Sequence, residues 1–120
     1  MNQHVCPYCN REVSTFKFRF NPHNLTPGKK AVPDTCPLSE QPIPVTGESE
    51  WDYERRAKLI ADLAEQVQDQ DPARVWLYLT ALPAGELQKL LMLSLAALNL
   101  DGTVEDMWKW VTDLPVARTA

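Results

Sequence analysis

The pattern of apolar and polar residues divides the chain near residue 47. Before this point, residues 15–20 alternate strictly, with three phenylalanines separated by Lys17 and Arg19. Because successive side chains of a strand point to opposite faces, this pattern predicts one strand with an aromatic face and a basic face. The rest of this half holds seven of the ten prolines and few aliphatic residues, which indicates loops.

From residue 48 onward, apolar residues recur at three- and four-residue spacing, which predicts helices. Asp71 followed by Pro72 is a helix start, Pro83 separates two helices, and Thr103 with Asp106 resembles a capping box. We expect about four helices, covering residues 49–70, 72–82, 84–98 and 103 to about 115.

The third of these helices is apolar on nearly all sides, which predicts the centre of a bundle or an interface between copies of the chain. We expect Trp51, Trp76 and Trp108 to pack in the core. Trp110 points away from the apolar side of its predicted helix, so it is the candidate for a partner surface.

These patterns predict a small, zinc-stapled, loop-rich N-terminal module with a short β element, followed by an all-α helical bundle. The expected divisions are residues 1–47 for the zinc-binding module, 48–115 for the acidic bundle and 116–120 for a frayed tail. The bundle has enough leucine and tryptophan to be expected to fold without metal. The N-terminal half has too few apolar residues to offset its ordering entropy, so something else must stabilise it.

The cysteines supply that stabilisation. Cys6-Pro7-Tyr8-Cys9, with His23 and Cys36 downstream, uses all three cysteines and predicts one structural Zn²⁺ in a Cys3His site. A two-residue gap lets one turn present both thiolates to a single ion, and the binding energy becomes folding energy. His4 is the main substitute for His23, and Asp34 is a remoter one.

Cys-Pro-Tyr-Cys also occurs in the active sites of glutaredoxins, so thiol–disulfide chemistry is the competing interpretation. That chemistry requires a cysteine at a helix N-terminus, whereas a strand pattern follows here. We find no phosphate-binding loop, nucleophile elbow or His-Glu-x-x-His helix, and four protein ligands leave no place for a catalytic water. The sequence therefore favours a protein that is not an enzyme.

Charge separates the two halves. Residues 1–47 carry five Lys or Arg against three Asp or Glu, and residues 48–120 carry seven against thirteen, for a formal net charge of −4 overall. A nucleic-acid binder would use four basic residues of the first half, with Phe16 or Tyr8 for stacking. These four are Lys17, Arg19, Lys29 and Lys30. A solvated face is the simpler interpretation, because phosphate repels the second half.

Cys36-Pro37-Leu38-Ser39, placed after Cys-Pro-x-Cys and a lone histidine, resembles small zinc-finger proteins encoded by phages of actinobacteria. Relatives often carry glycine after that serine, where this chain has Glu40. The resemblance covers about residues 5–44. It implies a phage-encoded zinc protein in the host cytoplasm that modulates a host or viral complex.

We therefore expect a non-enzymatic, zinc-binding adaptor or regulator that acts through protein contacts, with a second copy of the chain among its candidate partners. The three cysteines and the lack of a signal-peptide pattern indicate a cytoplasmic protein. The longest apolar stretch is too short to cross a bilayer, so no membrane partner is expected.

Overall fold

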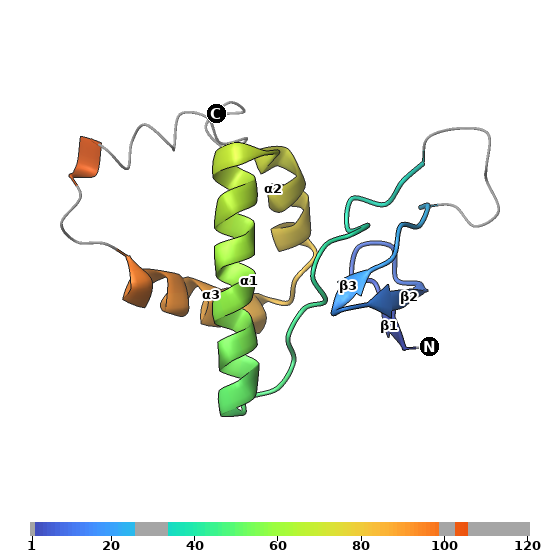
Figure 1. Ribbon diagram of the computed structural model, residues 1–120, viewed down its shortest axis with the longest axis horizontal. Coiled ribbons are helices and arrows are strands. Elements are labelled where there is room, and N and C mark those ends of the chain that lie inside the picture. Colours follow the sequence, from blue (N-terminus) through green and yellow to red (C-terminus); the bar gives the residue numbers. More distant parts are fainter. Residues whose placement is uncertain (1, 26–33, 99–102, 106–120) are drawn as a thin grey trace.

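The computed structural model describes residues 2–25, 34–98 and 103–105 (Figure 1). Its N-terminal part is a three-stranded antiparallel sheet of β1 (Gln3–Val5), β2 (Glu12–Phe16) and β3 (Arg19–Phe20), in the order β1-β2-β3. The turn that contains Cys6 and Cys9 connects β1 to β2, with His4 paired to Val13 across the first ladder. The predicted short β element is thus a small sheet.

The alternating segment is a hairpin and not the single strand that its pattern predicted. Lys17 and Phe18 both have positive φ, at 51° and 63°, and join β2 to β3 as a two-residue turn that matches the twist of paired strands. The three phenylalanines therefore do not share a face. Phe20 is buried at 1% exposure, whereas Phe16 and Phe18 are exposed. Alternation cannot reveal a tight turn, because the turn residues continue the pattern.

The segment after Cys36 lies between the sheet and the helices (Figure 1). On one side it bonds to the hairpin: Phe20 N–H donates to Gln41 O at 3.0 Å, and Ile43 N–H donates to Phe18 O at 2.8 Å. On the other side it bonds to the helices, as the Tyr78 hydroxyl donates to Pro42 O at 2.8 Å. We call residues 37–45 the connector.

Three helices follow, α1 (Glu50–Asp69), α2 (Pro72–Thr80) and α3 (Ala84–Ala97). Asp71 caps α2 with Pro72 at its first turn, as the sequence predicted. Ser49 and Asp52 form a capping box at the start of α1, which the sequence analysis did not identify. The described residues hold three helices where about four were expected. The fourth falls mostly outside them, since only residues 103–105 of that segment are described, and Trp108 and Trp110 lie outside as well.

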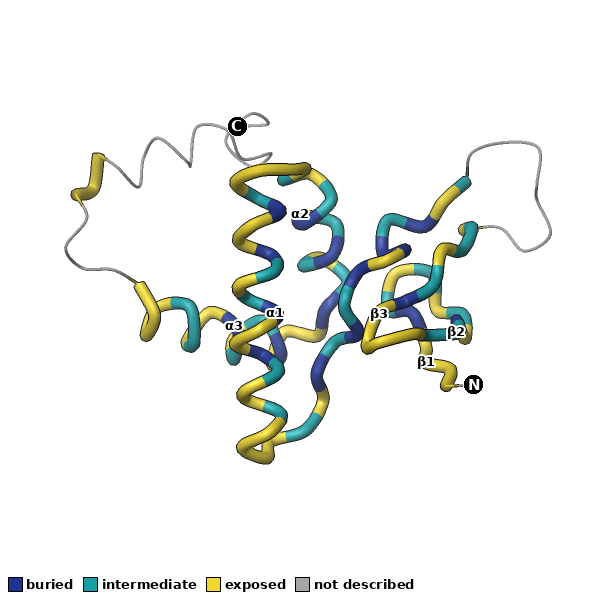
Figure 2. The backbone as a smooth tube through the Cα atoms, in the orientation of Figure 1, coloured by how far each residue is buried: buried dark blue, intermediate teal, exposed yellow. Residues whose placement is uncertain are grey.

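One buried cluster runs through both halves (Figure 2). The metal-site cysteines, Phe20 and the connector residue Leu38 belong to the same cluster as the inward faces of the helices. The buried amides of Gln41 and Gln66 exchange two hydrogen bonds, at 2.8 and 2.9 Å. The boundary at residue 47 remains a prediction, but the helices do not have a core of their own that is separate from the connector.

A buried ion pair joins α1 to α3. Arg56 is 0% exposed and donates to both carboxylate oxygens of Glu86 on α3, from Nε at 2.7 Å and from Nη2 at 3.0 Å. Nη2 also donates to Gly47 O at 2.6 Å, just before α1. A bidentate pair of this kind fixes where α3 crosses α1, because breaking it would leave a buried charge without its partner.

Two of the tryptophans are not where the pattern placed them. Trp51 and Trp76 were expected in the core but are 54% and 44% exposed. Arg56 and Gln66 fill buried positions of α1 instead, because the connector and α3 supply polar partners for them. Among the described residues, no helix combines the length and the apolar character that crossing a bilayer requires.

Candidate metal centre

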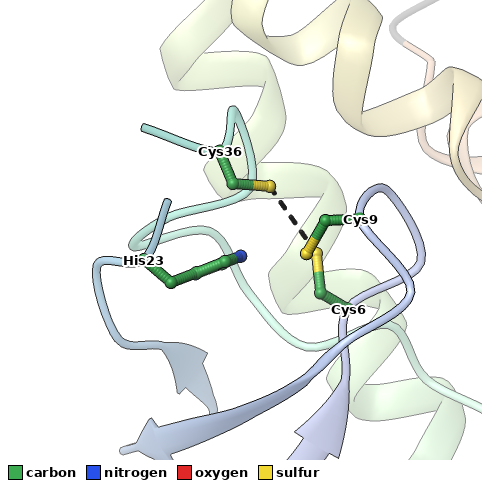
Figure 3. A group of neighbouring side chains, drawn as sticks. All are labelled: Cys6, Cys9, His23 and Cys36. Atoms are coloured by element: carbon green, nitrogen blue, oxygen red, sulfur yellow. Dashed lines mark hydrogen bonds between the residues drawn. The ribbon is translucent and has the colours of Figure 1, made fainter. Parts of the chain in front are cut away.

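Four side chains predicted as ligands converge at one point (Figure 3). The ligand atoms of Cys6, Cys9, His23 and Cys36 all lie within 4.8 Å of one another. The sulfurs of Cys6 and Cys36 are 3.8 Å apart. Tetrahedral zinc with Zn–S bonds of about 2.3 Å would separate two sulfurs by about 3.8 Å. The donor set and its spacing therefore fit one zinc ion.

The first cysteine pair is positioned by the turn between β1 and β2. Cys6 N–H donates to Arg11 O at 2.8 Å, and Asn10 N–H donates to Cys6 O at 2.7 Å. Asn10 has a φ of 60°, a left-handed conformation that asparagine tolerates well. This turn brings Cys9 back beside Cys6, so the pair is fixed by local sequence.

The second half of the site is assembled over a longer range. Cys36 N–H donates to His23 O at 2.8 Å, which joins the two ligand segments directly. The buried Ser39 hydroxyl accepts from His23 N–H at 3.0 Å and donates to His23 O at 3.1 Å. Ser39 thus holds His23 against the Cys36 turn. The sequence contained this serine in its motif but gave it no role.

Glu40 follows this serine with a φ of 66°, a left-handed conformation that favours glycine. Its N–H donates to Phe20 O at 2.8 Å, so the conformation serves to connect the Cys36 turn to β3. The preference for glycine after the serine, which the resemblance implied, has a physical reason in this backbone.

The imidazole of His23 is oriented for metal binding. Its Nδ1 lies 2.8 Å from Asn21 O, so Nδ1 carries the hydrogen and donates it. Its Nε2 is buried and has no hydrogen-bond partner among the described residues. An unpaired nitrogen lone pair in a buried position is costly. Since Nε2 faces the three sulfurs (Figure 3), a metal ion would satisfy it.

The pKa shifts of Cys6 and Cys36 disfavour three free thiolates in this space. The pKa of Cys36 is raised to about 12, mainly by burial and also by the adjacent Cys6 and Cys9 sulfurs, although the backbone N–H of Leu38 acts to lower it. Burial also raises the pKa of Cys6. A divalent cation replaces the protons and removes this repulsion, which is why soft thiolate clusters select zinc.

Cys9 differs from the other two. Burial raises its pKa, but the backbone N–H of Arg11 and hydrogen bonds from Cys6, from the Arg11 side chain and from Cys36 outweigh it, so its net pKa is lowered. Nε and Nη2 of Arg11 are buried without a nitrogen or oxygen partner in the described part of the chain. Arg11 would therefore be an outer cation beside the Cys3His centre, whose formal charge would be −1 with zinc bound to three thiolates and a neutral imidazole. Sequence reasoning had counted Arg11 only as a charge.

The other predicted site residues lie elsewhere. His4 is exposed on β1, and neither it nor Asp34 belongs to the ligand cluster. Arg19 is committed to Asp62 and to Glu40 O, which leaves it bound within the protein. Lys29 and Lys30 lie outside the described residues. The basic set predicted for nucleic acid is thus not brought together among the residues described.

Comparison with known proteins identifies a family for nearly the whole chain. A family model covers residues 1–118 and is described as a family of unknown function (DUF7368). The chain belongs to this family. No curated protein and no solved structure matches it. The matched span includes all four ligands and all three helices, so the metal centre and the helices belong to one family unit.

Proposed function

We propose that the protein is a non-enzymatic adaptor or regulator, whose Cys3His zinc centre is structural and whose partner contact is a surface of exposed aromatic and basic side chains. The zinc would close the loops that carry the connector and the hairpin, and so hold this surface rigid. Four protein donors would complete the tetrahedral coordination of one zinc ion, which would leave no open position for a substrate.

The observation that carries this proposal is a cluster formed by the hairpin turn and α1. The guanidinium of Arg55 lies 4.9 Å from the ring centres of both Phe18 and Trp51, and the two rings are 6.0 Å apart at an edge-to-face angle. Phe18 is 58% and Trp51 54% exposed. We call these three residues the hairpin–helix patch.

A preorganised patch of this composition supports protein binding. Trp and Arg are enriched among residues that dominate interface energies, and large aromatic side chains left in water favour burial by a partner. Lys17 and Phe18 adopt left-handed conformations that cost free energy at non-glycine residues. Beside the patch is a shallow hollow of about 220 Å³ that includes Ile43, Lys58 and Asp62 in its wall, where a partner side chain could insert.

Binding of single-stranded nucleic acid at the same patch is the second candidate. Lys17 Nζ lies 5.4 Å from the centre of the exposed Phe16 ring, and Arg55 and Lys58 add positive charge near Phe18. Aromatic rings with interspersed cations are typical of surfaces that bind single strands. Three available cations on a chain with a net charge of −4 would give weak affinity at physiological salt, so protein is the preferred partner.

The resemblance to actinobacterial phage proteins suggests where to look for that partner. If the chain is phage-encoded, it acts in the host cytoplasm on a host or viral complex, or on a second copy of itself. The experiment is quantitative affinity capture from an actinobacterial lysate with the zinc-loaded chain, with Trp51→Ser, and with Trp76→Ser as the matched loss of another exposed tryptophan.

The proposal is supported if the wild type and Trp76→Ser retain a protein in equal amounts and Trp51→Ser retains at least about tenfold less of it. A central interface tryptophan contributes roughly 2 kcal/mol or more to the binding free energy. Equal retention by all three chains refutes this patch as the contact. Binding of a labelled single-stranded oligonucleotide at physiological salt, lost in Trp51→Ser, would favour the second candidate instead.

A further inference from the structure

An apolar groove is left open on the side of α1 opposite the hairpin–helix patch. Ile60 and Val67 of α1, Leu79 of α2, and Leu87 and Leu91 of α3 contribute to its walls. Its volume is about 410 Å³. It begins where α3 crosses α1 and continues along α3 toward the end of that helix. It is independent of the proposed function, which uses other side chains.

The groove has no charged group free to recognise a polar ligand. Of the described residues that line it, Ser94 alone is polar, and its hydroxyl donates to Leu90 O at 2.8 Å within α3. The two charged residues of α3 are engaged, Glu86 with Arg56 and Lys89 with Glu48 at 3.1 Å. The occupant is therefore recognised by apolar contact.

The outer side of α3 continues this apolar surface. Leu91, Met92 and Leu95 are 59%, 63% and 55% exposed. Covering these side chains would be favourable, since removing apolar surface from water stabilises the covered state. Among the described elements, α1 packs against α3 and leaves these three side chains exposed.

The chain itself carries a suitable cover close by. Beyond α3 the sequence predicts an amphipathic helix from Thr103, with apolar residues at Met107, Trp108, Val111 and Leu114. The five residue steps from Leu98 to Thr103 can extend about 16 Å, and eight helical residues span about 12 Å. Val104 is 80% exposed, so the contact would begin after it.

We propose that residues 107–114 bind in this groove within the same chain and complete the helical bundle. A short tether gives the segment an effective concentration in the millimolar range, which favours it over a second copy or a separate protein at micromolar concentration. Trp108 and Val111 are the residues assigned to the groove, and Trp110 is assigned to the outer side.

The two isoleucines of the chain make a direct test possible. Ile60 lies in the groove, and Ile43 lies in the connector as an internal control. In the zinc-loaded full chain with labelled isoleucine methyl groups, we expect a nuclear Overhauser contact from the Trp108 indole to the Ile60 methyl. Trp108→Ala should abolish the contact and shift the Ile60 resonance, while Ile43 stays in place. Trp110→Ala should leave both resonances unchanged.

The groove side has its own matched pair. Leu91 lines the groove, whereas the adjacent Met92 is about equally exposed and does not line it. Leu91→Ser should therefore weaken the Trp108–Ile60 contact, and Met92→Ser should not. Absence of any contact, with Ile43 at its folded position, overturns the proposal. A contact seen only between differently labelled chains in a mixed sample assigns the groove to a second copy and also overturns it.

Discussion

Removal of the metal is expected to unfold the helices together with the N-terminal module, although the amino-acid pattern alone suggested a bundle that folds independently. The perturbation is His23→Ala, which deletes one ligand. His4→Ala is the matched control, because His4 is an exposed histidine outside the ligand cluster. Among the described residues, His23 and Cys36 are otherwise joined by the Cys36 N–H to His23 O bond and by the Ser39 hydroxyl.

The free energy lost on unfolding of the connector can be worked out from the contacts that it makes with the helices. Leu38 and Tyr78 are fully buried and would each lose roughly 1.5 to 3 kcal/mol of burial energy. The paired amides of Gln41 and Gln66 and the Tyr78–Pro42 bond add about 1 kcal/mol per hydrogen bond. The total, on the order of 6 to 9 kcal/mol, matches the whole stability of a typical small domain.

The assay follows helical circular dichroism and amide dispersion in parallel while a strong chelator is added. We expect both signals to fall together in the wild type and in His4→Ala, to recover when zinc is restored, and to be low in His23→Ala at the outset. Helical signal that survives while the dispersion of residues 2–25 is lost would refute the shared-core reasoning. Full metal content in His23→Ala combined with its loss in His4→Ala would refute the ligand assignment.

Three further predictions concern protons, the start of α1 and the buried ion pair. Because burial raises the pKa of Cys6 and Cys36, both thiols are protonated at neutral pH without metal, so zinc binding releases at least two protons. The apparent zinc affinity, measured by chelator competition, should therefore rise about hundredfold per pH unit. A rise of less than tenfold per pH unit would contradict this. Gly47→Ala should lower the free energy of unfolding by about 1 kcal/mol, because an added Cβ would lie 2.0 Å from the Asp52 carboxylate, which forms the capping box. An unchanged thermal melting curve would contradict this prediction. Glu86→Ala should lower the free energy of unfolding, measured with denaturant, by about 3 to 5 kcal/mol, because Arg56 is left charged and buried. Replacing both Arg56 and Glu86 by apolar residues should recover much of that loss.

The metal centre was the most predictable part of the molecule. Zinc chemistry restricts the ligands to a few residue types, and the chain offers three cysteines and two histidines. The two-residue spacing was enough to identify Cys6 and Cys9 as ligands, but the choice between His23 and His4 needed the folded structure. Of these two histidines, only His23 is joined to the Cys36 turn, through Cys36 N–H and Ser39. Helix starts were equally readable, because the caps at Ser49 and Asp71 satisfy N–H groups of their own first turns.

The tertiary structure decided what the helices face. Apolar periodicity placed Trp51 in the core, yet the position is exposed and stacks with Arg55, while the charged Arg56 is buried because Glu86, distant in sequence, pairs with it. In short, local sequence determined the cysteine turn, the helix starts and the donor set, since each depends on neighbours within a few residues. Burial and partner choice depend on contacts between segments 20 to 40 residues apart, as in Gln41–Gln66 and Pro42–Tyr78, and only the folded chain brings those together.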